Sequence, residues 1–442
     1  MIKVITYGTY DLFHYGHQRL LERAKDLGDY LIVGVTADDF DKQRGKINVK
    51  QSLMERIESV RATGLADEII IEEYEGQKID DIRRYDVDIF TVGSDWVGHF
   101  DYLKEYCDVV YLERTEGVSS SDIRSKNRSV NLGLVGEGNV LKKFFDESQF
   151  VNGIEVNAIL VDNENEKKCY ENEDLTLPEN YDDLLAIVDA VYIISHPSKH
   201  YSQVKKALNH GKHVLCESPF ALNQDECVEL EKLAIDNDLI LMDSIKTAYS
   251  TAYNRLLLLL KGGNIGDVYS IDATCTSLRD YDDNSWNSIT AWAPTALLPI
   301  FQILGVDYKD KNINSLISDY KPNFDLFTKI DFCYENAVAS IKVANGVKSE
   351  GELIISGSEG YAYVPAPWWK TDYFELRYEN QENNRKYFYQ LDGEGIRYEL
   401  VAFAKSIELR KNNTYVDFEV SKAICKIMED FENEDFNTIE KY

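Results

Sequence analysis

The sequence has few basic residues in comparison with its acidic residues. Its 442 residues include 48 lysines and arginines against 77 aspartates and glutamates, which gives a formal net charge of −29. A protein of this sign repels the phosphates of nucleic acids and of anionic membrane surfaces, so we expect neither as a partner. Any site for a phosphorylated small molecule must therefore be a local basic or dipolar spot within a negative field.

Further absences narrow the class of protein. The seven cysteines are scattered without a Cys-x-x-Cys pair, which is typical of reduced cytosolic thiols and not of a disulfide framework or a zinc site. There is no run of ~18 apolar residues, so no membrane-spanning helix is expected. The first apolar run ends at Gly8 and polar residues follow, so no signal peptide is expected either. We expect a cytoplasmic protein of two to three domains.

The most informative feature that is present is a pair of histidines near the amino terminus. Residues 2–6 have the pattern of a buried strand, and residues 16–27 have that of an amphipathic helix. His14 and His17 therefore stand where a helix begins after a strand. A helix N-terminus offers free N–H groups and a partial positive charge to an anion. The pattern indicates a phosphate-binding corner; two surface histidines or half of a metal site are the alternatives.

Short apolar strands alternate with helices over the first 112 residues. We expect strands at 2–6, 30–35, 68–72, 88–92 and 108–112, and helices at 16–27, 51–63 and 77–84. This alternation predicts an α/β domain with a parallel sheet covered on both faces. Residues 122–130 are polar and basic and are interpreted as a linker, so the first domain is expected to span residues 1–128.

Five segments of this domain resemble the glycerol-3-phosphate cytidylyltransferases, which belong to the nucleotidyltransferase superfamily marked by His-x-Gly-His. The segments are 7–11, 14–17, 20–25, 93–96 and 114–121. The family reads Arg-Thr-x-Gly-Ile-Ser-Thr-Thr in the last of them, where serines here keep the hydroxyl groups. The resemblance implies a Rossmann-like nucleotidyltransferase domain. It would transfer a cytidylyl group from CTP, with Mg²⁺, to glycerol phosphate or to another polyol phosphate such as ribitol or erythritol phosphate.

The resemblance also implies roles for individual residues. The catalytic residues, which would stabilise charge on the reacting phosphates, are His14, His17, Lys46 and Arg114. The residues that would hold the nucleotide and the acceptor are Thr9, Tyr10, Asp11, Arg44, Asp95, Trp96, Thr115, Ser119, Ser120 and Ser121. Asp11 and Asp95 are candidates for indirect support of Mg²⁺, and no protein metal site is expected.

A second nucleotide-binding pattern begins at residue 131. A strand runs into Gly136-Glu137-Gly138 and a helix, and a further strand at 156–161 closes on Asp162. An acidic residue at this place can accept hydrogen bonds from an adenosine ribose, which favours NAD over NADP. Leu141 stands where this fingerprint has its third glycine or alanine, so the helix must pack on the strand in a different way.

Residues 131–400 resemble the family of glucose–fructose oxidoreductase and inositol dehydrogenase. The resemblance rests on segments 189–200 and 211–219 and implies an NAD-binding Rossmann domain over 129–250. An α+β domain with an open, mostly antiparallel sheet would follow over 251–442, with helices near 395–410 and 419–431 and an acidic tail that frays into solvent. The cofactor-binding residues would be Gly136, Gly138, Asn139, Asp162, Ser195, His196, His200 and Glu217.

The second half departs from this family where a proton donor is needed. Ser218 replaces the family's catalytic lysine, Thr295 falls where a histidine or tyrosine is usual, and no histidine follows His213. Reduction of a carbonyl needs such a donor. Lys246 or Tyr249 could take its place, or both could be ordinary residues at a helix start.

Two hypotheses for the second half follow. In the first it is an NAD-dependent oxidoreductase that makes the polyol precursor of a bifunctional enzyme for cell-surface polysaccharide biosynthesis. In the second it is an inactive binding or dimerisation scaffold. Members of both families commonly form dimers, so a homodimer with small-molecule substrates is expected.

Overall fold

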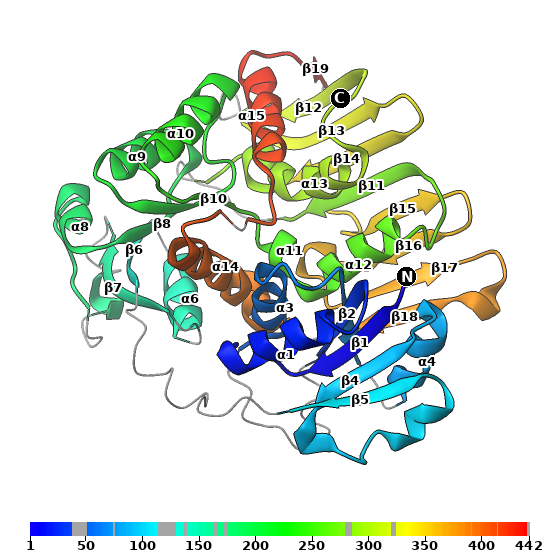
Figure 1. Cartoon of the computed structure of the whole chain (residues 1–442). Coiled ribbons are helices and arrows are strands. Elements are labelled where there is room, and N and C mark those ends of the chain that lie inside the picture. The colour runs from blue at the N-terminus through cyan, green and yellow to red at the C-terminus, as the bar shows by residue number, and fades with distance from the viewer. Residues whose placement is uncertain are drawn as a thin grey trace. The chain divides into compact units, whose positions relative to one another are not determined.

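The computed structural model describes residues 1–37, 51–73, 76–113, 130–136, 139–149, 151, 153–161, 167–170, 175–278, 285–319, 324–389, 391–412 and 414–439. The chain divides into two compact units, Met1–Arg128 and Ser129–Tyr442. Figure 1 labels their elements. Among the helices of the described ranges, none has the length and apolar character needed to cross a bilayer.

The first unit contains a five-stranded parallel sheet in the order β3-β2-β1-β4-β5. Its strands are β1 (Lys3–Gly8), β2 (Tyr30–Thr36), β3 (Glu68–Glu72), β4 (Ile89–Gly93) and β5 (Asp108–Leu112). Its helices are α1 (Tyr15–Lys25), α3 (Leu53–Ala62) and α4 (Gln77–Tyr85), with short 3₁₀ turns η1 (Ser94–Trp96) and η2 (Asp101–Glu105). The strand order reverses between β1 and β4, and ligands of such sheets bind outside the carboxyl ends of the strands at this switch point.

The central strands β1, β2 and β4 of the first unit are largely buried, because they are rich in apolar residues. Ile5, Ile32 and Phe90 are completely buried in one core cluster of this unit. Covered strands of this kind are typical of a parallel sheet with helices on its faces. The predicted strands and helices of this unit lie within about two residues of the observed ones, as expected for a strongly periodic sequence.

The second unit opens with another five-stranded parallel sheet, in the order β10-β9-β8-β6-β7. Its strands are β6 (Val130–Gly136), β7 (Ile154–Leu160), β8 (Ala190–Ile194), β9 (His213–Glu217) and β10 (Leu241–Ser244). The helices between them are α6 (Asn139–Ser148), α8 (Tyr181–Ile187), α9 (Pro197–Asn209) and α10 (Gln224–Asp236), with a 3₁₀ turn η3 (Lys168–Tyr170). The switch point here lies between β6 and β8.

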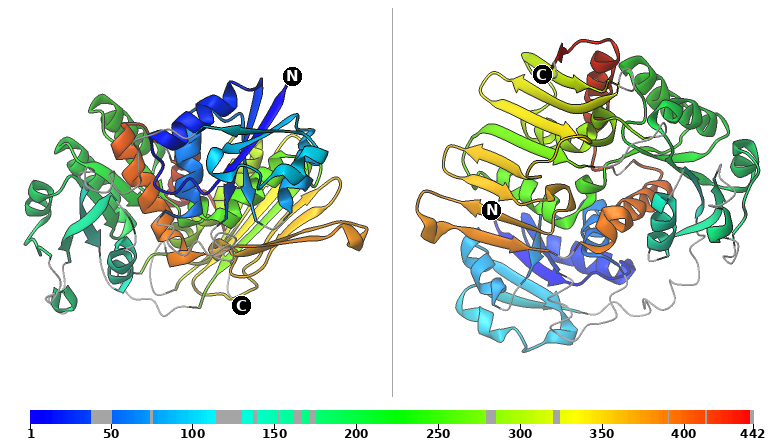
Figure 2. Two further views of the ribbon diagram at one scale, coloured as in Figure 1. Left: turned by 60° about the horizontal axis from the view of Figure 1, so that its bottom comes forward. Right: turned by 180° about the vertical axis from the view of Figure 1, so that it is seen from behind.

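A nine-stranded sheet follows, in the order β18-β17-β16-β15-β11-β14-β13-β12-β19. Its strands are β11 (Val268–Thr276), β12 (Asp310–Ile317), β13 (Asp325–Cys333), β14 (Val338–Ala344), β15 (Leu353–Gly357), β16 (Tyr361–Val364), β17 (Tyr373–Arg377), β18 (Arg385–Phe388) and β19 (Asn437–Thr438). Only the pairs β11–β14 and β12–β19 of these described strands are parallel. Figure 2 shows the yellow and orange strands of this sheet side by side in one layer. The predicted fold class, including the open and mostly antiparallel sheet, is confirmed.

The remaining helices join the two sheets of the second unit. They are α11 (Lys246–Tyr249), α12 (Thr251–Lys261), α13 (Ser288–Leu304), α14 (Ile396–Leu409) and α15 (Phe418–Glu432), with 3₁₀ turns η4 (Trp368–Lys370), η5 (Gln381–Asn383) and η6 (Asp392–Gly395). Helix α13 packs on β11, β13 and β14, whereas α14 packs on α6 and α15 on α10. Because the last two helices return to the Rossmann sheet, the contacts do not separate residues 129–250 from 251–442.

The acidic tail is ordered, and the expectation that it frays is wrong. Helix α15 continues through Asp430, which is 7% exposed. The Nζ atom of Lys311, on β12, lies 3.0 Å from an Asp430 carboxylate oxygen, and the Nζ atom of Lys426 lies 2.9 Å from the other. Two ammonium groups compensate the buried charge there, and β19 then adds a short strand beside β12.

We predict that residues 1–128 fold when they are expressed alone. This unit has its own closed core and its own complete parallel sheet. The isolated fragment should unfold cooperatively in urea and should show protected amides in β1, β2 and β4 by hydrogen exchange. A fragment whose amides exchange as in an unfolded chain would contradict the division of the molecule into independent units.

Candidate active sites

His14 and His17 cap each other's backbone at the start of α1. His14 has extended backbone geometry, and its Nδ1 atom accepts a hydrogen bond from the Gly16 N–H at 3.0 Å. The His17 Nδ1 atom accepts from the His14 N–H at 3.4 Å. The two rings stack with their centroids 4.0 Å apart and 19° between their planes. Two of the N–H groups at this helix terminus are therefore satisfied by imidazoles instead of the usual Ser, Thr or Asp.

Glycine between the two histidines leaves room for the His14 ring. A Cβ atom on Gly16 would lie 2.9 Å from Cε1 of the His14 ring. Any larger residue would push the ring away from its backbone partner. The sequence pattern alone did not reveal this contact between position 16 and the His14 ring.

The cap also sets the protonation of the rings. Because Nδ1 of each ring accepts a backbone N–H, the neutral imidazole carries its proton on Nε2. Partial burial lowers the pKa of His14, which favours this neutral form near pH 7. The Nε2–H groups are donors suited to a phosphate oxygen, and they add to the dipole of the α1 N-terminus.

The loop between β1 and α1 holds this corner in a strained conformation. Tyr10 and Leu12 have positive φ angles of 54° and 48°, which are uncommon for residues other than glycine. Tyr10 is 2% exposed, and its ring meets the His17 ring edge-on with the centroids 5.5 Å apart. We predicted that Tyr10 contacts the nucleotide; the structure shows it buried as a support for His17.

A buried arginine that the sequence analysis missed fixes the strand ends beside this loop. Arg56, on α3, is completely buried. Its Nη1 atom donates to the carbonyl oxygens of Thr9 at 2.8 Å and of Thr36 at 2.7 Å. The carboxylate of Asp11 accepts the N–H of Gln51 at 2.9 Å. Arg56 and Asp11 therefore tie the ends of β1 and β2 to the segment that precedes α3.

The remaining predicted residues of this site are placed only in part. Trp96 belongs to η1, which follows β4, and its ring lies 5.4 Å from that of His99. Strand β4, which leads to η1, ends at the same edge of the sheet as β1. The side chain of Asp95 and the residues Arg44, Lys46, Arg114, Thr115, Ser119, Ser120 and Ser121 lie outside the described residues.

A cavity of about 520 Å³ opens in the second unit at the carboxyl ends of its parallel strands. It is lined from these strand ends by Ile194, Glu217 and Ser244, from α6 by Val140, and from the region of the nine-stranded sheet by three tryptophans. A site at this edge is where doubly wound sheets bind dinucleotides. Gly136 ends β6 at this edge and packs closely on β8, because a Cβ atom there would lie 2.9 Å from the carbonyl oxygen of Ile194.

The cavity separates the predicted cofactor residues into two groups. His196 and Glu217 line it, as do Ser218 and Thr295. His200 does not line it: the ring is completely buried, with Nδ1 2.7 Å from the Pro219 carbonyl oxygen and Nε2 2.6 Å from that of Ser195. We predicted that His200 binds the cofactor, but these contacts give it the structural role of fastening two loops.

Ser195, another predicted cofactor residue, follows β8. Ser195 has its hydroxyl hydrogen-bonded to the side chain of Gln203. Gly138 and Asp162 lie outside the described residues, as does the side chain of Asn139.

The structure also separates the two candidate proton donors. Lys246 lines the cavity, and its Nζ atom lies 2.6 Å from a carboxylate oxygen of Glu217. Tyr249 is 1% exposed and lies outside the cavity, with its hydroxyl 3.1 Å from that of Thr414. Of these two residues, Lys246 lines the cavity and Tyr249 does not.

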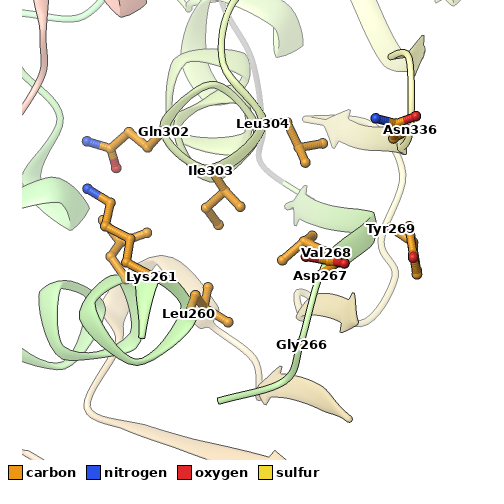
Figure 3. Close-up of a pocket in the computed structure, with 11 residues that line it drawn as sticks. Leu260, Lys261, Gly266, Asp267, Val268, Tyr269, Gln302, Ile303, Leu304 and Asn336 are labelled. Carbon is orange, nitrogen blue, oxygen red and sulfur yellow. The ribbon is translucent and has the colours of Figure 1, made fainter. Parts of the chain in front are cut away.

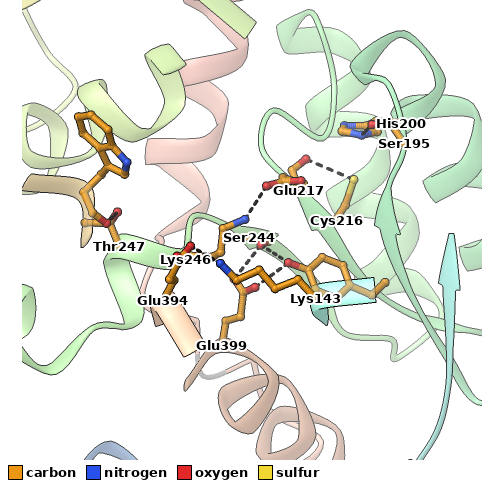
Figure 4. A network of polar contacts seen from close by, with 12 residues as sticks. Lys143, Ser195, His200, Cys216, Glu217, Ser244, Lys246, Thr247, Glu394 and Glu399 are labelled. Atoms are coloured by element: carbon orange, nitrogen blue, oxygen red, sulfur yellow. Dashed lines mark hydrogen bonds and ion pairs between the residues drawn. The ribbon is translucent and has the colours of Figure 1, made fainter. Parts of the chain in front are cut away.

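A buried carboxylate adjoins the cavity (Figure 4). Glu399, on α14, is completely buried, and its two oxygens accept hydrogen bonds from the hydroxyls of Tyr192 at 2.6 Å and Ser244 at 2.7 Å. Burial raises the pKa of Glu399 to about 7, although Lys246 and the two hydroxyls oppose the shift. Its distance in sequence from its partners explains why the sequence analysis missed it.

A second cavity of the same unit, of about 650 Å³, lacks the chemistry of an active site. Figure 3 shows it between α12, the end of α13 and the start of β11. Leu260, Ile303 and Leu304 form much of its lining, and the amide of Gln302 donates to the Tyr415 carbonyl oxygen. None of the predicted site residues lies there.

Comparison with known proteins identifies the first unit. The sequence model of the cytidylyltransferase-like family matches residues 5–126. The glycerol-3-phosphate cytidylyltransferase of Bacillus spizizenii is 52% identical over 130 residues, which are 29% of this chain and 100% of that protein. The chain belongs to this family through its first unit. The corresponding enzyme of Bacillus subtilis is 48% identical over 126 residues, 28% of this chain and 97% of that protein. The prediction of a cytidylyltransferase-type enzyme is confirmed.

The second unit matches an oxidoreductase family. The sequence model of the oxidoreductase family with an NAD-binding Rossmann fold covers residues 130–244. The solved structure of KijD10, a 3-ketoreductase from Actinomadura kijaniata in complex with NADP and TDP-benzene, aligns with 71% of this chain and 100% of its own, with a TM-score of 0.64 and 16% identity. At this identity the likeness shows the fold, which agrees with the resemblance inferred from the sequence.

We predict that the cap and the chemistry of His14 can be separated by substitution. His14→Asn keeps a side-chain acceptor for the Gly16 N–H, whereas His14→Ala loses it and should lower the protection of α1 amides in hydrogen exchange by about 1 kcal/mol. Both variants lose the Nε2–H donor, so turnover should fall by about 10²–10³-fold in each. Near-normal turnover of His14→Asn would show that this imidazole does not act on the substrate.

We predict a pH-dependent stability from Glu399. The pKa of Glu399 is about 7 in the folded chain, whereas the ordinary value for glutamate, 4.5, applies to the unfolded chain. Folding therefore favours the protonated form of Glu399. That stabilisation is fully present below pH 4.5 and is lost as the pH rises through 7. Glu399→Gln should therefore be more stable than the parent at pH 8, by up to about 3 kcal/mol, and this difference should shrink towards pH 5. A difference in urea unfolding that stays constant from pH 5 to 8 would contradict this.

Proposed function

We propose that the first unit transfers the cytidylyl group of CTP to glycerol phosphate and releases pyrophosphate. The observation that carries the proposal is the capped pair His14 and His17 at the N-terminus of α1, at the switch point of a parallel sheet. The glycerol-3-phosphate cytidylyltransferases to which this unit is similar support the choice of nucleotide and acceptor. Ribitol and erythritol phosphate are the alternative acceptors.

The geometry suits the charge that develops in this reaction. A phosphate oxygen of the acceptor attacks the α-phosphorus of CTP, and pyrophosphate leaves. Such a displacement needs positioning and charge stabilisation more than a covalent catalyst. The Nε2–H groups of His14 and His17 would donate to the phosphate oxygens, and the dipole of α1 would add partial positive charge at its N-terminus. Lys46 and Arg114 would neutralise the remaining phosphates, and Mg²⁺ would accompany CTP.

The proposal is tested by measuring pyrophosphate release from the full chain. Each nucleoside triphosphate is combined with glycerol, ribitol and erythritol phosphates and with Mg²⁺. CTP with glycerol phosphate should give the highest kcat/KM. A strong preference for ATP, or no reaction with any polyol phosphate, would overturn the proposal.

We further propose that the second unit binds NAD(H). Gly136 and the N-terminus of α6 would hold the pyrophosphate, and His196 and Glu217 would lie beside the cofactor in the cavity. The bound group would supply hydride chemistry. The cavity at the strand ends favours this over an inactive scaffold. A homodimer acting in the cytoplasm, in the synthesis of a cell-surface polymer, completes the proposal.

We predict that NAD(H) binds more tightly than NADP(H), because the Asp162 carboxylate would repel a 2′-phosphate and accept hydrogen bonds from a ribose hydroxyl. Calorimetric titration of both cofactors measures this preference, and Asp162→Ala should reduce it. Equal affinities in the native chain would refute the role of Asp162. Absence of binding for both cofactors would instead support the scaffold hypothesis.

A further inference from the structure

Lysines gather in the cavity of the second unit although the chain as a whole is strongly acidic. Lys143, Lys246 and Lys370 line it from three different elements, against the carboxylates of Glu217 and Glu394. Lys370 Nζ lies 2.7 Å from Glu394, which also forms an ion pair with Lys143. The described lysines therefore outnumber the described carboxylates in this lining, and the cavity favours an anionic ligand.

Aromatic walls accompany these charges. Trp286, Trp292 and Trp369 line the same cavity, and the rings of Trp292 and Trp369 lie 5.1 Å apart. Indole faces exclude water and pack against the C–H groups of a carbon chain or ring. A small ligand with an apolar C–H face and an anionic end satisfies both parts of the lining. A polyol chain that carries a phosphate has this composition.

Lys246 reaches the end of β9, where Ser218 replaces the catalytic lysine of the oxidoreductase family. It follows β10, and its side chain crosses to the neighbouring strand β9, where its Nζ atom pairs with Glu217 next to Ser218. Figure 4 shows this ion pair beside the buried Glu399. Burial lowers the pKa of Lys246, but the carboxylates of Glu217 and Glu399 raise it by more, so the group keeps its proton at neutral pH. The protonated amine lies in the lining of the cavity, where it can give a proton to a substrate that displaces it from Glu217.

We propose that the second unit reduces the carbonyl of a phosphorylated keto-polyol and that Lys246 is the proton donor. This inference rests on the proposed binding of a nicotinamide cofactor. The carbonyl carbon takes a hydride from the reduced nicotinamide, and the carbonyl oxygen takes a proton from Nζ of Lys246. A C–H and an O–H bond form as the C=O π bond breaks. The ketone gains two electrons and becomes an alcohol, the nicotinamide is oxidised, and the neutral amine regains a proton from water.

The product of this step is a polyol phosphate, which is the class of acceptor proposed for the first unit. Carbonyl reduction would thus supply the substrate that cytidylyl transfer consumes. Lys143 and Lys370, now held by Glu394, would bind the phosphate end of the substrate.

Substitution of Lys246 by arginine tests the proposal without removing its charge. Lys246→Arg keeps a cation beside Glu217, but a guanidinium does not give up its proton in proteins. With the full chain, NADH and keto-polyol phosphates of three to five carbons, the parent should oxidise NADH. Lys246→Arg should lower kcat by at least about 10²-fold while NADH affinity measured by fluorescence stays within about threefold. The control is Lys206→Arg, whose lysine pairs with Asp182 outside the cavity and whose activity should match the parent.

A second readout does not depend on turnover. Acetylation of lysines in the chain without cofactor is followed by peptide mass spectrometry. A keto-polyol phosphate should slow the modification of Lys246 and Lys370 but not of Lys206, and the unphosphorylated keto-polyol should protect less.

The outcomes separate this inference from the proposed functions. Parental kcat in Lys246→Arg would overturn the role of Lys246. Binding of NADH with no keto-polyol phosphate reduced or protecting Lys246 would overturn the substrate class while leaving cofactor binding intact. Pyrophosphate release from CTP is measured in the same samples, so loss of cytidylyl transfer is recognised as a separate failure.

Discussion

In both units the proposed chemistry depends on the helix that follows the first strand of a parallel sheet. Parallel pairing brings the carboxyl ends of all the strands to one edge, and the first N–H groups of the following helix point to that edge without intrahelical partners. In the first unit β1 leads to α1, and in the second unit β6 leads to α6. Each unit thereby offers positive potential to a phosphate within a chain of net charge −29.

The two units surround the N-terminus of this helix with different groups. In the first unit, imidazoles occupy the cap positions. The Nδ1 atom of each ring accepts a backbone N–H, and Nε2 carries the proton that can be donated. In the second, side chains from neighbouring strand ends and from the region of the nine-stranded sheet line the cavity. One site therefore depends on two residues three apart in the chain, whereas the other is assembled from many elements.

This difference decides how much the sequence could predict. Strands, helices and the histidine pair follow from local periodicity and spacing, and they agree with the structure. The contacts of Glu399 with Tyr192 and Ser244 join residues 207 and 155 positions apart, and no local pattern marks them. Arg56 looks like an ordinary helix residue until the strand ends that it joins are known. The expectation that the acidic tail frays is wrong for the same reason. The partner of Asp430 is Lys311, which lies on a strand distant in the sequence.

The state of the two histidine rings tests the central claim most directly. Nitrogen NMR of the chain labelled at histidine, with His14→Asn and His17→Asn used for assignment, reports which ring nitrogen carries the proton. Both rings should show a bare Nδ1 and a protonated Nε2, and CTP with Mg²⁺ should shift the Nε2–H signals of both residues. A proton on Nδ1, or Nε2 signals that do not change when CTP is added, would contradict a phosphate-binding role for the capped pair.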